Sequence, residues 1–85
     1  MSSWQVALVK AQSVEFAVVC VRDDVVESSH ERNRLTAWWH GQLERPVVLL
    51  GARRHRLFGR RDIVNFLRQI EPSRLPWRRM QVNET

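Results

Sequence analysis

The stretch SVEFAVVCVRDDVVES, residues 13–28, decides the fold of this chain. Its apolar and β-branched residues occupy both alternating sets of positions, which is typical of a strand that is covered on both faces or lies centrally in its sheet. The acidic pair Asp23–Asp24 marks the end of this strand. The two sets are Phe16, Val18 and Cys20 on one side and Ala17, Val19 and Val21 on the other.

The residues before this stretch predict a second strand. In SWQVALVKAQ, residues 3–12, Trp4, Val6 and Leu8 alternate with more polar positions, as in a half-buried strand. Only a few residues around position 12 separate the two strands, so we expect an antiparallel hairpin.

A helix is predicted next, over SSHERNRLTAWWHGQL, residues 28–43. Ser28 and Glu31 have the spacing of a capping box, which satisfies two backbone donors at the helix start. Apolar residues then recur at helical spacing, and Pro46 prevents the helix from continuing. This apolar face holds Leu35, Trp38, Trp39 and Leu43, and we expect Arg32, Thr36 and His40 to point to water.

The second half of the chain repeats a strand–strand–helix order. PVVLL (46–50) predicts a buried strand and RLFGR (56–60) its partner, with 51–55 as the turn. RDIVNFLRQI (61–70) predicts a helix, because its apolar residues follow the i, i+3, i+4, i+7 pattern. An extended segment is expected over 77–82.

The predicted fold class is therefore α+β, in the order β-β-α-β-β-α. The crossover through the first helix favours a parallel, right-handed connection. We expect a two-layer sandwich in which a four-stranded mixed sheet carries both helices on one face. The 85 residues suit a single domain, residues 1–85, with an ordered core over about 3–80 and a frayed tail over 81–85.

Positive charge is concentrated in the second half of the chain. Residues 1–50 hold five Lys and Arg against six Asp and Glu, whereas residues 51–79 hold nine arginines against two acidic residues. A genome rich in G and C explains arginine in place of lysine, but it does not explain the clustering. Such asymmetry indicates an anionic partner.

Eight residues are the candidate anion or nucleic-acid contacts. Arg60 and Arg61 precede a helix, where free N–H groups and guanidinium groups together suit an anion. Trp77 beside two arginines resembles the aromatic and basic combination that binds single strands, although a tryptophan that clamps the tail onto the core explains it equally. Solvation of a hairpin tip is the alternative for residues 53–56. The candidates are Arg53, Arg54, Arg56, Arg60, Arg61, Trp77, Arg78 and Arg79.

Other chemistry finds little support in the sequence. Cys20 is the only cysteine, so no disulfide or dithiol motif forms, and within AVVCV we expect a small buried side chain. His30, His40 and His55 lack the spacing of metal ligands. No catalytic constellation is visible, so we expect no enzyme activity, metal, cofactor or small-molecule substrate. The apolar runs are too short to span a membrane, and we expect a bacterial cytoplasmic protein.

Two resemblances are visible. PVVLLGARRHRLFGRRDIVNFLRQI, residues 46–70, resembles the closing strand–strand–helix half of thioredoxin- and glutaredoxin-like domains, but it lacks the C-x-x-C motif, so no redox activity is implied. DIVNFLRQIEPSRLPWRRM resembles a family of small uncharacterised bacterial proteins, which implies a single small domain and supplies no activity.

Three functions remain open from the sequence. The leading hypothesis is a small binding module whose arginine-rich half engages nucleic acid or another polyanion. The alternative is a protein-interaction module that pairs with itself or with an acidic protein through an exposed sheet edge or a tryptophan-bearing surface, with no role in nucleic-acid binding. The third is a degenerate redox-fold protein that retains a reactive Cys20.

Overall fold

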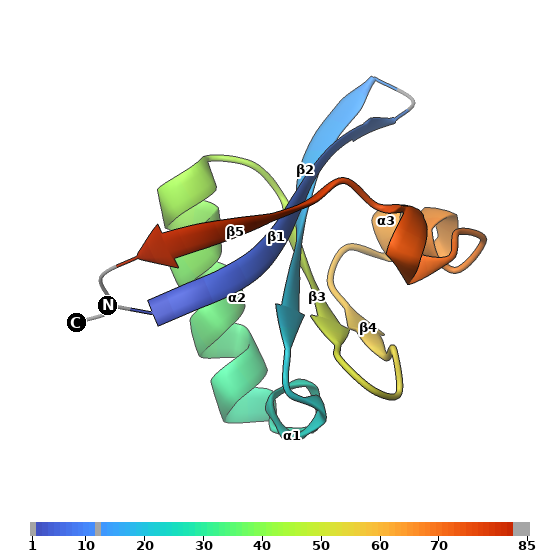
Figure 1. Ribbon diagram of the computed structural model, residues 1–85. Helices are drawn as coiled ribbons and strands as arrows, with labels where there is room; N and C mark the ends of the chain where they lie inside the picture. Colours follow the sequence, from blue (N-terminus) through green and yellow to red (C-terminus); the bar gives the residue numbers. More distant parts are fainter. Residues whose placement is uncertain (1, 12, 83–85) are drawn as a thin grey trace.

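The structure is a computed structural model that describes residues 2–11 and 13–82. Five strands, three α-helices and one 3₁₀ turn follow one another along the chain (Figure 1). They are β1 (Ser2–Ala11), β2 (Val14–Val21), α1 (Asp23–Glu27), α2 (Ser29–Leu43), β3 (Val47–Gly51), β4 (Leu57–Phe58), α3 (Arg61–Leu67), η1 (Pro72–Arg74) and β5 (Trp77–Val82).

The strands form one mixed sheet in the order β4-β3-β2-β1-β5. β1 and β2 make the predicted antiparallel hairpin, and β3 lies antiparallel to β4. The crossover through α2 brings β3 parallel to β2, with Ala17 opposite Val47 and Val21 opposite Gly51. The α+β class and the parallel crossover are thus confirmed.

The prediction of a two-layer sandwich with both helices on one face is wrong. One core cluster holds Val19 and Val21 of β2 together with residues of α1 and α2, among them the fully buried Trp39. The other holds Phe16 and Val18, on the opposite face of β2, together with residues of α3 and Leu75, which follows η1. Figure 1 shows α2 and α3 on either side of the sheet. The two alternating apolar sets of β2 require a cover on each face, so the helices must divide between them.

The sheet has a fifth strand because the predicted extended segment 77–82 pairs with β1. Trp77 lies opposite Ala7, and the pairing continues to Val82 opposite Ser2. The strand extends two residues further than the ordered core that we expected, and residues 83–85 lie outside the described part of the chain.

The predicted first helix is α2, and its cap is half of a capping box. Ser28 Oγ accepts a hydrogen bond from the backbone N–H of Glu31 at 3.3 Å. The Glu31 carboxylate does not reach back; it pairs with Arg34 at 2.9 Å. A further short helix, α1, follows the end of β2, and Glu44 in a left-handed conformation ends α2.

The turn between β3 and β4 covers residues 52–56, one residue later than predicted, and it is attached to the start of α1. Asp23 Oδ1 accepts hydrogen bonds from the backbone N–H groups of Arg53 and Arg54, at 3.2 and 3.3 Å. Gly51 makes room for this carboxylate, since a Cβ there would lie 2.5 Å from Asp23 Oδ1. The acidic end of β2 therefore fixes the arginine-rich turn.

Candidate anion-binding site

The structure places the eight predicted residues in three separate regions. Arg53, Arg54 and Arg56 lie in the β3–β4 turn, and the pair Arg60–Arg61 lies where α3 begins. The remaining three lie in β5, at the opposite edge of the sheet from β4. Four strand spacings separate these edges, about 19 Å. The fold therefore does not bring the β5 arginines beside the others.

In β5, the side chain of Trp77 packs against the core. Its side chain is half-buried in the α3-side cluster, and its indole N–H donates to the Pro72 carbonyl at 2.7 Å. This geometry favours the alternative in which the tryptophan clamps the chain. Arg78 and Arg79 are exposed, and as adjacent strand residues they point to opposite faces.

Arg60, the residue before α3, forms an ion pair with the Asp62 carboxylate in the first turn of that helix. Its Nε and Nη2 donate to the two oxygens of Asp62, both at 2.8 Å. The hydrogen bond from Arg60 is the main cause that lowers the pKa of Asp62 from 3.8 to about 2, and Asp62 in turn raises the pKa of Arg60. Arg61 is exposed at the first position of this seven-residue helix.

A different group of basic residues comes together beside the β3–β4 turn. We call it the basic hollow, a depression of about 470 Å³ between α1, α2, the turn, β4 and the end of α3. One carboxylate, Glu27, lies among its basic side chains and contacts two of them. Those basic residues are Arg32, Arg54, His55, Arg56 and Arg68.

Glu27 orients the two turn arginines. Its Oε1 lies 3.1 Å from Arg54 Nη1 and 3.8 Å from Arg56 Nη1. All three side chains are partly exposed, so this contact holds the arginines near the hollow while leaving them accessible to solvent. One carboxylate shared by two guanidinium groups leaves an excess of positive charge.

Arg32 forms part of the floor of the basic hollow, which corrects the expectation that it points to water. Its Nη1 donates to the Val26 carbonyl at 3.2 Å, and its guanidinium carbon lies 4.6 Å from the centre of the Phe58 ring. Its Nε is buried and has no hydrogen-bond partner among the described residues. Contact with the aromatic face holds this cation in a half-buried position.

Arg68, at the end of α3, completes the hollow. Its side chain is exposed and makes no ion pair within residues 2–11 and 13–82. Sequence reasoning missed Arg32 and Arg68 as site residues because helical spacing shows only that each lies off an apolar stripe. Their proximity to the turn depends on how α2 and α3 dock on the sheet.

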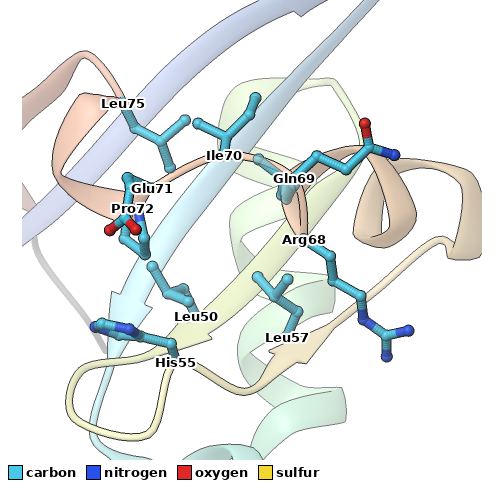
Figure 2. A pocket seen from close by; sticks show the side chains of 10 residues that line it. Leu50, His55, Leu57, Arg68, Gln69, Ile70, Glu71, Pro72 and Leu75 are labelled. Atoms are coloured by element: carbon cyan, nitrogen blue, oxygen red, sulfur yellow. The ribbon is translucent and has the colours of Figure 1, made fainter.

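A second hollow, of about 360 Å³, adjoins the basic hollow (Figure 2). We call it the apolar hollow because six of its ten lining residues are apolar; the other four are His55, Arg68, Gln69 and Glu71. The two share His55, Leu57 and Arg68. In Figure 2, Leu50 and Leu57 lie between His55 on one side and Arg68 on the other, and Glu71 lies on the same side of the hollow as His55. Further apolar contacts come from Leu67, Ile70 and Leu75.

A third hollow, of about 270 Å³, brings His55 and Cys20 into one lining. Cys20 is half-buried rather than fully buried. Burial, and then the charge of Asp23, raise the pKa of its thiol, so the nucleophilic thiolate is disfavoured. This environment gives no support to the redox hypothesis.

The other two histidines lie away from these hollows. His30 and His40 lie exposed on α2, and within the described ranges no three His, Cys, Asp or Glu residues are placed to hold a metal ion. No helix in this part of the chain has the length and apolar character needed to cross a membrane.

No protein-family model, curated protein or solved structure matches the chain.

Proposed function

We propose that this protein is a small cytoplasmic binding module that engages nucleic acid, or a polyanion of similar charge, through the basic hollow. One observation carries the proposal: four arginines and a histidine from three segments surround a single depression that contains one carboxylate. Side chains of like charge repel one another when they gather without a counterion, and an anionic ligand removes that repulsion.

The chemistry of arginine favours phosphate as the ligand. The planar guanidinium group donates two parallel hydrogen bonds and suits phosphate oxygens. Arg54 and Arg56 both contact one oxygen, Oε1 of Glu27, and keep N–H groups free for a further acceptor. Phosphate contacts of this kind carry affinity without sequence information.

The proposal narrows the set of contact residues. Arg54, Arg56 and Arg68 bind phosphates, with Arg53 at the turn and Arg32 in the floor. Arg60 and Arg61 lie apart at the start of α3, and Arg78 and Arg79 lie on the far edge of the sheet. The last pair therefore serves as a control for charge alone.

The alternative function is self-association through β5. This strand pairs with β1 on one side only, and its other edge is open among the described residues. Met80 and Val82 on it are half-buried. Against this, Arg78 and Arg79 are charged edge residues of the kind that discourage pairing between sheets. The molecular size of the protein, measured over a range of concentrations, distinguishes the two functions. A dimer whose formation is unaffected by nucleic acid supports only the alternative.

The test is a titration of labelled single-stranded and double-stranded oligonucleotides at about 50 mM and about 200 mM salt. Three phosphate contacts lead us to expect affinity to fall roughly 20-fold for a single strand and roughly 40-fold for a duplex between these conditions. The same result for several base sequences is expected. Absence of binding at the lower salt concentration retires the proposal.

A further inference from the structure

The basic hollow and the apolar hollow lie next to each other. They share His55, Leu57 and Arg68, so a ligand that spans these three residues contacts both hollows. An isolated inorganic phosphate or sulfate ion would use only the basic part. The apolar part, at about 360 Å³, is at the small end of the roughly 300–1,000 Å³ usual for small-molecule sites.

We infer that the ligand is single-stranded nucleic acid, one base of which enters the apolar hollow while the adjoining phosphates lie in the basic hollow. This inference rests on the proposed function and adds which form of nucleic acid is bound. A nucleotide combines a flat, largely apolar base with a neighbouring anion, which is the combination that the two hollows present.

Duplex nucleic acid does not satisfy this arrangement. Its phosphates face outward, but its bases are stacked in the helix and cannot enter a hollow without being extruded. In a single strand the bases are free to leave the stack and to pack against apolar, histidine or arginine side chains. The apolar hollow therefore stabilises the single strand and contributes little to duplex binding.

The residues at the junction have distinct roles. Arg68 lies at the boundary of the two hollows, where its guanidinium group contacts the phosphate next to the bound base. His55, whose backbone is left-handed with φ of 56°, lines both hollows, where its ring packs against the bound base. Glu71 at the rim accepts a hydrogen bond from a base amino group.

An acidic peptide with apolar side chains presents a related pattern. The observations favour nucleic acid because Gln69 and Glu71 line the apolar hollow beside its leucines. The edge of a base can hydrogen-bond to these polar groups, whereas an aliphatic side chain cannot. The experiment must therefore distinguish binding of an acidic peptide from binding of a single strand.

The experiment compares four anionic ligands at one low salt concentration. They are a single strand of about eight nucleotides, an abasic phosphodiester chain of the same length, a duplex, and a peptide of alternating leucine and glutamate. We expect the single strand to bind roughly tenfold more tightly than the abasic chain and more tightly than the duplex.

Two variants locate the effect. His55→Asn keeps a residue that tolerates a left-handed backbone and removes the ring, so we expect the preference for the single strand over the abasic chain to shrink. His30→Asn, at an exposed histidine of α2, is the matched control and leaves the preference unchanged. A preference that survives His55→Asn in full, in protein with an unchanged circular dichroism spectrum, overturns the assignment.

The results distinguish failure of the base-binding inference from failure of the proposed function. Equal affinity for single strand, abasic chain and duplex overturns the base-binding inference while the proposed function stands. Tighter binding of the peptide than of any nucleic acid overturns it in favour of a protein partner. If no nucleic acid binds at low salt, the proposed function itself fails.

Discussion

The Asp23 carboxylate accepts a hydrogen bond from the backbone N–H of Arg54 at 3.3 Å, although the two residues are 31 positions apart in the chain. The acidic end of β2 is thereby joined to the basic turn between β3 and β4. The same oxygen accepts from the next N–H towards β3, so the turn is fixed at two points before any ligand binds. Such preorganisation lowers the entropic cost of binding.

Replacing Asp23 tests this attachment. Asp23→Ala removes both hydrogen bonds, so we expect the amide hydrogens of Arg53 and Arg54 to exchange roughly fivefold faster, as for loss of a hydrogen bond of about 1 kcal/mol. Asp23→Asn keeps the accepting oxygen and is the matched control. Unchanged exchange rates in the alanine variant would show that another contact holds the turn.

The contribution of the Ser28 cap to stability is tested by comparing two serine variants at the start of α2. Ser28→Ala removes the side-chain acceptor for the Glu31 N–H, and we expect the free energy of unfolding to fall by about 1 kcal/mol. Ser29→Ala changes the exposed first residue of the helix and serves as the control, with an effect near zero. Urea denaturation measures both. Equal losses would mean that the cap contributes nothing.

Trp77 is expected to stabilise the fold through its hydrogen bond to Pro72. Trp77→Phe leaves the Pro72 carbonyl without this donor, so we expect a loss of about 1–2 kcal/mol in the free energy of unfolding. Trp38→Phe shrinks another half-buried indole, one that makes no hydrogen bond in the described part of the chain. The idea that Trp77 acts as a clamp is contradicted if both variants lose the same stability.

The Arg60–Asp62 pair predicts an acid-sensitive contact. The pKa of Asp62 is lowered from 3.8 to about 2, so the contribution of the pair is complete above the unfolded value and is lost as pH falls through about 2. Carboxyl carbon chemical shifts should show this midpoint. In Arg60→Gln the midpoint should return towards 3.8, and a midpoint that stays near 2 would assign the shift to the helix backbone instead.

Local sequence patterns predicted most of the individual elements. The alternation in β2, the Ser28 cap and the spacing of Ile63, Phe66 and Leu67 are local signals, and an element appears at each of them. Two bounds were wrong: α3 ends at Leu67 and not at residue 70, and β4 covers only Leu57–Phe58 of the predicted 56–60. The division of helices between the two faces was also present in the sequence, in the two apolar sets of β2. The prediction that both helices pack on one face of the sheet was wrong because it left the second apolar set of β2 without a cover.

The candidate site could be predicted only in part. The turn arginines were identifiable because they are neighbours in the chain. Arg32 and Arg68 join them through the docking of two helices, which spacing within either helix does not encode. The β5 arginines were grouped with the others because of their place in the chain, but β5 pairs with β1 at the far edge of the sheet.

The most direct measurement compares two double variants in a single-strand titration at low salt. Arg56→Gln with Arg68→Gln alters the basic hollow, and Arg78→Gln with Arg79→Gln alters β5; both lower the net charge by two. Net charge alone would weaken binding equally in the two proteins. We predict a loss of roughly tenfold or more for the first variant and little change for the second. Equal losses, or a larger loss in the β5 variant, would contradict the basic hollow as the binding site.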